Sequence, residues 1–172
     1  MPIIAFLRGV NVGGHRTFRP SLLAAKLNHL DLVNIGAAGT FIIRSPVSQT
    51  QLHSELRKHL PFETHIMTCA SRELLATVSQ NPFDGIPMRA DLVRFVAVLA
   101  KRSRSLPVLP LQIPSEGKWF VRILCCHGRF VFGCYRREMK SIGYLGSMDK
   151  ILGAPATIRN WNTINQILKI LE

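Results

Sequence analysis

The sequence predicts an α+β protein of two ferredoxin-like halves, each with the element order β-α-β-β-α-β and a trailing helix. Three observations lead to this prediction. Short β-rich runs alternate with helical stripes in the first half, turn-forming residues gather near the middle, and the second half repeats the same order more loosely. Residues 1–82 and 88–172 are therefore expected to form the two domains. Sequence identity between the halves is negligible, so the repeat rests on element order alone.

The strands of the first half are predicted from β-branched and aromatic content. They are expected at residues 2–8, 32–37, 40–44 and 64–69, and the middle two form a hairpin that turns at Gly39. The segment after this half, from Asn81 to Pro87, contains two prolines, a glycine, an asparagine and an aspartate. These are the residues that favour turns, so the boundary between the halves is placed there.

The helices of the first half are predicted from leucine spacing and end signals. One begins at Pro20, because proline suits the first helical position, and a second and a third begin after the capping residues Ser48 and Ser71. Pro61 ends the second. The residues expected on the buried faces are Leu22, Leu23, Leu27 and Leu30, then Leu52, Leu56 and Leu60, then Leu74, Leu75 and Val78.

The second half contains the same kinds of element with weaker signals. Strands are expected at residues 91–99, 119–125, 129–135 and 156–159, the middle two as a hairpin around His127 and Gly128. The region of Pro107, Pro110 and Pro114 is a poor helix at best, with a short helix at 103–112 left open, and another short helix is expected at 147–152. The last helix, at 161–171, is expected to bury Trp161, Ile164, Ile167, Leu168 and Leu171.

The chain is strongly basic, and the charge is uneven. The net charge is +12, from 22 Lys and Arg against 10 Asp and Glu. Residues 87–172 hold 14 basic and 5 acidic residues, an excess of nine, whereas residues 1–86 hold 8 and 5, an excess of three. Such an excess attracts polyanions and anionic ligands, although it also serves solubility.

Other bulk features exclude several classes of protein. No apolar run approaches the roughly 20 residues of a membrane helix, and the N-terminus lacks the pattern of a secretion signal, so a cytoplasmic protein without a membrane partner is expected. The four cysteines form no C-x-x-C pair, and the six histidines show no ligand grouping, so no metal or cofactor is predicted. Reduced, mostly buried thiols are expected at Cys69, Cys125, Cys126 and Cys134.

A glycine-rich loop between the first strand and the first helix is the first candidate ligand site. Glycine lets backbone N–H groups turn inward, so such a loop can receive an anion. The alternative is a tight turn in which the Asn11 side chain satisfies local backbone groups. The loop fits neither G-x-G-x-x-G nor a Walker A sequence. Its candidate residues are Arg8, Gly9, Asn11, Gly13, Gly14, His15 and Arg16.

The segment from Arg159 to Thr163 is the second candidate. Arg159 stands before a helix, where it could hold a carboxylate or phosphate, or instead form a structural ion pair. Asn160 or Asn162 is a natural helix cap, and Trp161 is expected in the core. Arg159, Asn160, Asn162 and Thr163 are the candidate residues of this segment.

Two basic clusters are candidates for nucleic-acid binding. They are Lys101, Arg102 and Arg104, and then Arg136, Arg137 and Lys140. On ferredoxin-like sheets, strand aromatics can stack on bases, and Phe6, Phe41, Phe95, Phe130 and Phe132 lie on predicted strands. The pattern typical of RNA-recognition modules is absent, however, which favours a core role for these rings.

Both ends of the chain resemble a mainly bacterial family, domain of unknown function 1697. Residues 5–14, Ala-Phe-Leu-Arg-Gly-Val-Asn-Val-Gly-Gly, are similar to its "ALLRGINVGG" opening, and residues 156–163, Ala-Thr-Ile-Arg-Asn-Trp-Asn-Thr, are similar to its "ATTRNWNT" signature. The resemblance implies an α+β protein of two ferredoxin-like halves and no established activity. This chain departs from the family at Ala37, Ala38, Gly39 and Thr40, where the family carries a polar "QSGN" segment. Lys140, Ser141 and Ile142 are loosely aligned with a Ser-Lys-Leu of the family.

These observations lead to three functional hypotheses. The first is a non-catalytic basic protein that binds nucleic acid or another polyanion. The second is a binding protein or enzyme for a small phosphate- or carboxylate-bearing metabolite, with Arg8 and Arg159 converging on it. The third is an assembly protein that uses an open sheet edge. No catalytic constellation is evident, so binding is favoured over catalysis, and the ligand and the oligomeric state are left open.

Overall fold

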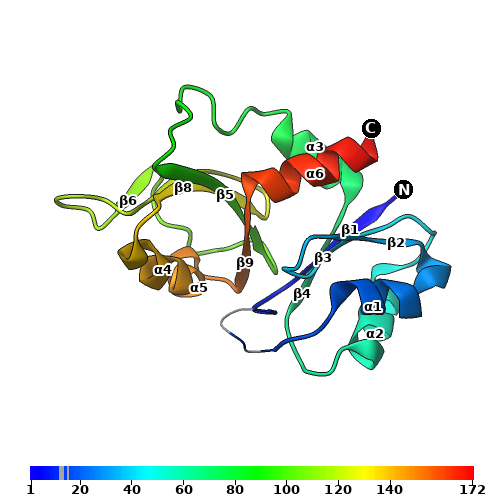
Figure 1. Ribbon diagram of the computed structural model, residues 1–172. Coiled ribbons are helices and arrows are strands. Elements are labelled where there is room, and N and C mark those ends of the chain that lie inside the picture. Colours follow the sequence, from blue (N-terminus) through cyan, green and yellow to red (C-terminus); the bar gives the residue numbers. More distant parts are fainter. Residues whose placement is uncertain (12–13, 15) are drawn as a thin grey trace. The chain divides into compact units, whose positions relative to one another are not determined.

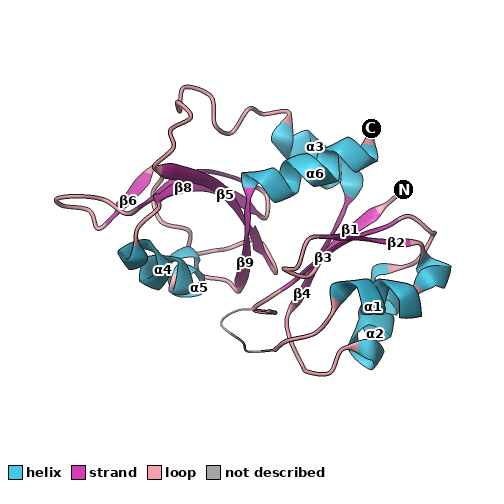
Figure 2. Cartoon of the chain, in the orientation of Figure 1, coloured by secondary structure: helices cyan, strands magenta, loops and turns pink. Residues whose placement is uncertain are grey.

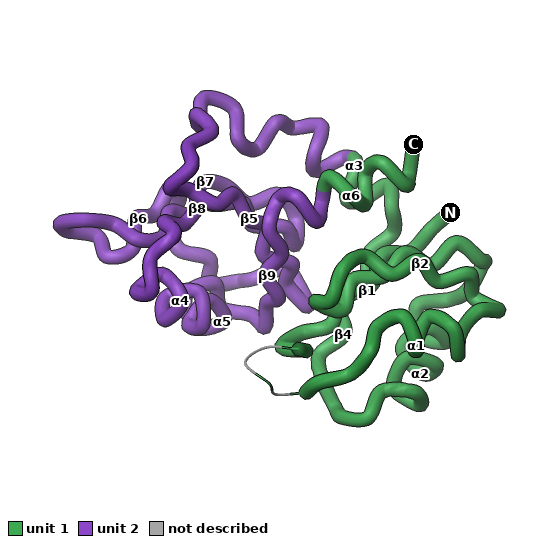
Figure 3. Tube along the Cα trace, in the orientation of Figure 1, with its two compact units in different colours: residues 1–75, 165–172 green, residues 76–164 purple. Residues whose placement is uncertain are grey.

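The computed structural model describes residues 1–11, 14 and 16–172, and divides the chain into two compact units. Unit 1 contains Met1–Leu75 and Asn165–Glu172, and unit 2 contains Ala76–Ile164 (Figure 3). Figures 1 and 2 show that each unit is built around a β-sheet with helices beside it. Of the residues predicted for the glycine loop, Gly13 and His15 lie outside the described part.

Unit 1 contains a four-stranded antiparallel sheet with the strand order β2-β3-β1-β4. This order, with β1 and β3 in the centre, is that of a ferredoxin-like βαββαβ unit. The elements are β1 (Ile3–Leu7), α1 (Pro20–Lys26), a 3₁₀ turn at Asn28–Leu30, β2 (Leu32–Ile35), β3 (Thr40–Ile43), α2 (Gln49–His59) and β4 (Ile66–Ala70). The trailing helix α3 (Ser71–Val78) begins in unit 1, and its residues from Ala76 onward belong to unit 2. Every element predicted for this half is present.

The core of unit 1 lies between the sheet and helices α1 and α2. Because strand side chains alternate between faces, Ala5 and Leu7 of β1 point into this core. The α2 stripe of Leu52, Leu56 and Leu60 is buried as predicted. Leu22, however, is 53% exposed. The buried stripe of α1 runs through Leu23 and Leu27, and a residue adjacent to a stripe is rotated about 100° away from it.

The start of α2 is fixed by a capping box. Ser48 Oγ accepts a hydrogen bond from Gln51 N at 3.1 Å, and Ser48 N donates to Gln51 Oε1 at 3.3 Å. Two backbone N–H groups at this helix end, those of Ser48 and Gln51, therefore donate to side-chain oxygens. The predicted cap at Ser48 is confirmed.

Unit 2 contains a five-stranded antiparallel sheet with the order β6-β7-β8-β5-β9. Without β6, the order β7-β8-β5-β9 repeats that of unit 1, so this half is also ferredoxin-like. Its elements are β5 (Leu92–Leu99), β6 (Leu111–Ile113), β7 (Val121–His127), β8 (Phe130–Arg136), α4 (Met139–Gly146), α5 (Met148–Leu152) and β9 (Ala156–Asn160). The trailing helix α6 (Trp161–Leu171) begins in unit 2, and its residues from Asn165 onward belong to unit 1. The last helix begins and ends where the sequence predicts.

Unit 2 differs from unit 1 between β5 and β7. Instead of a first helix, the chain forms irregular structure and β6, a three-residue strand at the outer edge of the sheet. Pro110 and Pro114 flank β6 and, with Pro107, leave this region without three backbone donors that a helix would use. Helix α4 was not predicted. Its segment, from Met139 to Gly146, contains two glycines, which disfavour a helix, and its large apolar side chains Met139 and Ile142 are exposed rather than part of a buried stripe.

The two faces of the unit 2 sheet differ in character. One face packs on α4 and α5 and carries Phe95, Ala97, Val121, Ile123 and Val131. The strand register places Arg94, Arg122, Cys134, Arg136 and Arg159 on the other face, together with Phe130 and Phe132. Four arginines therefore share the face opposite α4 and α5.

Candidate functional site

The glycine loop begins directly after β1, and its described residues include several left-handed backbone conformations. Gly9, Asn11, Gly14 and Arg16 have φ values of 65°, 54°, 77° and 49°. Such angles are easy for glycine and tolerable for asparagine, but uncommon for arginine. The loop therefore depends on contacts that hold it in place.

Among the described residues of the loop, Asn11 provides two such contacts. Its Nδ2 donates to Ala37 O at 2.8 Å, and its Oδ1 accepts from Phe18 N at 2.9 Å. These bonds join Asn11 to the β2–β3 turn and to the segment that precedes α1. They support the alternative in which Asn11 satisfies local backbone groups. They also place Asn11 beside the β2–β3 turn, which contains Ala37.

Gly39 lies at the same junction. Leu7 N donates to Gly39 O at 2.8 Å, and a Cβ added at Gly39 would lie 2.7 Å from Val10 Cγ2 and 2.8 Å from Leu7 Cβ. The turn therefore approaches β1 more closely than a side chain permits. This close approach, and its φ of 79°, explain the glycine at this position.

Arg16 contributes to a pocket at the start of β4. Its guanidinium donates to Thr64 Oγ1 at 3.3 Å, and Thr64 Oγ1 donates to Arg8 O. Arg8 N donates to His65 O at 3.0 Å. The pocket has a volume of about 640 Å³ and is lined by Arg16, Arg57, Leu60, Phe62, Glu63, Thr64, His65 and Ile66. Arg16 thus lies near a second arginine, Arg57, which the sequence did not single out.

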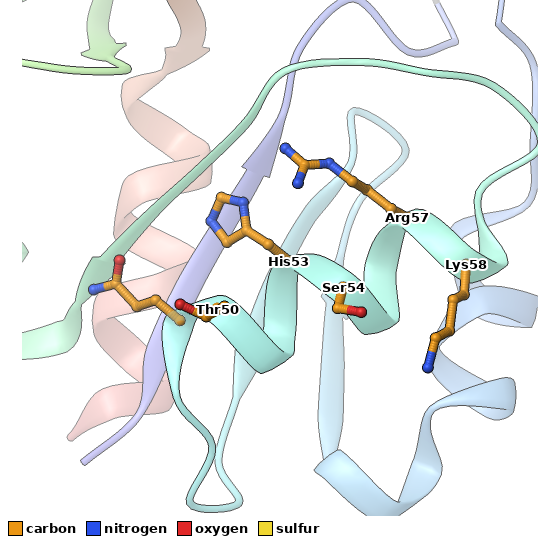
Figure 4. A pocket seen from close by; sticks show the side chains of 6 residues that line it. Thr50, His53, Ser54, Arg57 and Lys58 are labelled. Atoms are coloured by element: carbon orange, nitrogen blue, oxygen red, sulfur yellow. The ribbon is translucent and has the colours of Figure 1, made fainter.

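A second pocket lies along α2 (Figure 4), with a volume of about 770 Å³. In Figure 4, His53 and Arg57 extend from α2 toward the same side, whereas Lys58 points away. His53 Nε2 lies 3.0 Å from Thr68 Oγ1, whose hydroxyl donates to Gln49 Oε1 at 3.0 Å. Burial lowers the pKa of His53, and the charge of Arg57 lowers it further.

The segment from Arg159 to Thr163 is explained largely by its structural contacts. Arg159 is 5% exposed and donates to Thr157 Oγ1 at 2.7 Å and to Ile158 O at 2.9 Å. Burial lowers its pKa to about 10, so it remains a cation at neutral pH. Asn160 Oδ1 accepts from Thr163 N at 3.0 Å and thereby caps α6. Trp161 packs on Phe83, with ring centroids 4.8 Å apart.

The other residues of this segment have different surroundings. Thr163 Oγ1 also donates to Asn160 Oδ1, at 3.2 Å, whereas Asn162 is exposed. Arg159 belongs to unit 2 and Arg8 to unit 1. Their convergence on one ligand stays a prediction.

The two predicted basic clusters lie at opposite ends of β8. Arg102 lies by the β7–β8 turn, because a Cβ added at Gly128 would be 3.8 Å from its guanidinium. Arg136 ends β8, and Arg137 and Lys140 follow it. A strand of this length spans about 20 Å. Lys101, Arg102 and Arg104 are exposed, as are Arg137 and Lys140. The two clusters are therefore separate.

Trp119 and Phe120, two adjacent aromatic residues directly before β7, were not predicted as site residues. The guanidinium carbons of Arg122 and Arg136 lie 4.3 and 4.2 Å from the ring centroid of Trp119. The ring of Phe120 has the ammonium groups of Lys118 and Lys140 at 5.6 and 5.7 Å. Both rings are half-buried, and Phe120 stacks on Tyr144 at 6.0 Å. The signal in the sequence was the run Lys118-Trp119-Phe120-Val121-Arg122, in which aromatic and basic residues are interleaved.

Metal-ligating side chains and thiols are spread over the described residues. Among them, no group of three or more His, Cys, Asp or Glu side chains could hold a metal ion. The cysteines are all free thiols, with Cys69 and Cys134 buried and Cys125 and Cys126 partly so. No helix in this part of the chain is both long and apolar enough to cross a membrane.

Comparison with known proteins adds a family and a related structure. The chain is similar in structure to the conserved bacterial protein SP0830 from Streptococcus pneumoniae, with a TM-score of 0.65, 18% sequence identity, and coverage of 99% of this chain and 98% of that one. At this identity the likeness concerns the fold. No curated protein matches the sequence. The family model described as protein of unknown function (DUF1697) matches residues 1–110, which include the glycine loop but not the segment from Arg159 to Thr163. The chain therefore belongs to the DUF1697 family.

Proposed function

We propose that this protein binds single-stranded nucleic acid through unit 2, as a non-catalytic binding protein. One observation carries the proposal: Trp119 and Phe120 are adjacent, half-buried aromatic rings, and each has two cationic side chains within 6 Å of its ring. Aromatic faces stack on bases of any sequence, and cations beside them attract the phosphate backbone. The excess of nine positive charges in residues 87–172 adds long-range attraction.

The geometry favours a single strand over a duplex. Proteins that bind single strands combine a basic track with aromatic stacking platforms, and they need no element that enters a groove. Trp119 and Phe120 lie on an irregular segment between β6 and β7. Phe120 lies beside the first residues of α4, because its carbonyl oxygen accepts from Ser141 Oγ and its ring lies 5.7 Å from the Lys140 ammonium group. The exposed side chains of Arg137 and Lys140 continue the basic surface from there.

The test is a salt-dependent binding measurement with a matched charge control. A labelled single-stranded oligonucleotide of about 12 bases would be titrated with the full chain at several salt concentrations, followed by fluorescence anisotropy. The double variant Lys118→Gln, Lys140→Gln removes two cations beside Phe120. The control, Lys26→Gln with Lys169→Gln, removes the same charge from two helices of unit 1.

We expect the first variant to bind more weakly than the control. Its plot of log affinity against log salt should lose a slope of about 0.7 for each cation that no longer contacts a phosphate. Equal losses in the two variants would mean that net charge alone causes the binding, and the proposal would fail. Binding by the wild type no tighter than that of a charge-matched unrelated protein would have the same meaning.

A second candidate is the binding of a small phosphate- or carboxylate-bearing metabolite in unit 1. What supports it is the pocket of about 640 Å³ in which Arg16 and Arg57 accompany Thr64 and the glycine loop. Two guanidinium groups in a concave site suit an oxyanion. Crystals grown with sulfate would test this directly. Density bound by Arg16 and Arg57 would support the site, and an empty pocket at high sulfate concentration would count against it.

A further inference from the structure

Three arginines on the sheet of unit 2 surround one position. Arg94 of β5 and Arg122 of β7 both pair in register with Cys134 of β8, which lies between them. Arg136 follows two residues later on β8 and so faces the same side. Burial raises the pKa of the Cys134 thiol, and the charges of Arg122, Arg94 and Arg136 oppose this effect. All three guanidinium groups are therefore close enough for their charges to act at the same place.

The positive charge of this cluster is only partly balanced. Asp91 pairs with Arg89 at 2.9 Å and lies 3.7 Å from a guanidinium nitrogen of Arg136. Arg94 donates to Ile86 O, which is uncharged. Within the described part of the chain, neither Arg94 nor Arg122 forms an ion pair, and the guanidinium of Arg122 makes no hydrogen bond. Like charges this close repel one another, so the cluster is incomplete without a counter-charge.

Two nitrogen atoms of the cluster also lack hydrogen-bond partners. Nε of Arg94 and Nε of Arg122 are both buried and unsatisfied. A buried donor without an acceptor is costly, and such groups are rare in folded proteins. Arg94 and Arg122 are neighbours that pair with the same residue, so an acceptor oxygen of a ligand between them could satisfy both nitrogen atoms.

Trp119 gives the cluster a fixed geometry. Arg122 and Arg136 both stack near its ring, and Arg136 Nε donates to Trp119 O at 2.7 Å. A guanidinium group that stacks on an aromatic face keeps the N–H donors in its own plane available. The indole therefore positions Arg122 while leaving its donors free for an oxyanion.

We propose that Arg94, Arg122 and Arg136 bind one phosphate group. A phosphate offers several acceptor oxygens and one or two negative charges, which suits three guanidinium groups better than a singly charged carboxylate does. The phosphate is either that of a free phosphate ester or a phosphodiester of a nucleic-acid strand that passes Trp119. The second source rests on the proposed function, whereas the phosphate site itself does not.

The experiment uses the full chain and inorganic phosphate, then the oligonucleotide. Arginine Nε–H signals are followed by ¹⁵N NMR while phosphate replaces chloride at constant ionic strength. We expect saturable shifts in the signals of Arg94 and Arg122. Arg122→Gln should weaken phosphate binding about tenfold or more, and Arg122→Lys, which keeps the charge but not the fork, should also weaken it. Arg104→Gln, an exposed arginine elsewhere in unit 2, is the charge-matched control and should have little effect.

The outcomes separate this inference from the proposed function. Saturable phosphate binding that depends on Arg122, with no oligonucleotide binding, would support a free phosphate ester and reject the nucleic-acid function. Phosphate that competes with the oligonucleotide at Arg122 would support both. No saturation, or equal losses in the Arg122 and Arg104 variants, would overturn the site, even if the oligonucleotide still binds. The NMR spectrum of each variant also reports whether it is folded, and Arg122→Lys provides a second test if Arg122→Gln is not.

Discussion

Gly39 lies so close to β1 and Val10 that the structure leaves no room for a side chain at this position. Replacement by alanine would place Cβ within 3 Å of Val10 and Leu7, in a backbone conformation that disfavours any side chain. We expect Gly39→Ala to lower the free energy of unfolding by about 2–4 kcal/mol, because overpacking adds to the cost of the positive φ. Urea unfolding measures this.

Gly36→Ala is the matched control for that measurement. Gly36 has a similar φ of 68°, but a Cβ added there would meet nothing within 4 Å. Its cost should be about 1–2 kcal/mol, from the backbone conformation alone. If the two variants were equally destabilised, the close approach of the turn to β1 would not matter for stability.

His53 makes the stability of the protein depend on pH. Burial and the Arg57 charge lower its pKa, so below the ordinary value of 6.5 the unfolded chain binds a proton more readily than the folded protein does. The free energy of unfolding should therefore fall as the pH falls from 6.5 toward the lower pKa of the folded state. Urea unfolding of the wild type and of His53→Gln across this range should give a flatter profile for the variant.

Arg57→Gln tests the second cause of the same shift. Removing the guanidinium should raise the His53 pKa, and NMR titration of the imidazole would show it. Lys58→Gln is the control, because Lys58 points away from His53 in Figure 4 and pairs with Glu55 at 3.1 Å. An unchanged His53 pKa in Arg57→Gln would leave burial as the sole cause.

Several residue roles could be predicted from the sequence, because they depend on neighbours in the chain. The caps at Ser48 and Asn160 act three residues ahead, and the turn glycine at Gly39 follows from its hairpin. The arrangement of Arg94, Arg122 and Cys134 could not be predicted. It depends on the register of three strands and on an irregularity between Ile123 and Cys125, which shifts the facing of residues along β7.

The two asparagines at the start of helix α6 have different roles. Asn160 caps the helix through Thr163 N, whereas Asn162 is exposed inside its first turn. We expect Asn160→Ala to lower the free energy of unfolding by about 1 kcal/mol and Asn162→Ala to change it little. Thermal or urea unfolding of the two variants provides the comparison. A larger effect of Asn162→Ala would point to a contact beyond helix capping.

The region between β5 and β7 shows where element prediction reaches its limit. Three prolines argued against a helix there, and the structure has none, but β6 is only three residues long and has no periodic pattern to detect. Its formation depends on pairing with β7, from Leu111 opposite Ile123 to Ile113 opposite Val121. Long, periodic elements such as α2 and α6 could be placed from sequence because their apolar stripes extend over several turns.

The reactivity of the four cysteines would report how deeply each thiol is buried. All are free thiols, and burial raises the pKa of Cys125, Cys126 and Cys134. A thiol with a raised pKa has less of the reactive thiolate at neutral pH. We therefore expect slow alkylation of the native protein, with Cys125 and Cys126 modified before Cys69 and Cys134, and rapid modification of all four in denaturant. Mass spectrometry of the peptides would identify the order, and early modification of Cys69 would contradict the burial described here.

The two ferredoxin-like halves could be predicted because their element order needs no knowledge of tertiary contacts. Leucine stripes, caps and turn residues indicate a helix or a strand locally, and the βαββαβ order then leaves few arrangements of the sheet. The separation of the two basic clusters could not be predicted in the same way. Arg102 and Arg137 are distant because β8 extends between them, and only the sheet reveals which end each occupies.

The prolines on both sides of β6 bear on the behaviour of the protein at high concentration. A strand at the edge of a sheet can recruit the same strand of another molecule, which is how many fibres grow. At this edge the recruiting surface is limited to Leu111–Ile113, and Pro110 and Pro114 offer no N–H groups to extend it. The β6 edge is thus protected against strand-by-strand growth, and concentrated solutions should not form fibres through it.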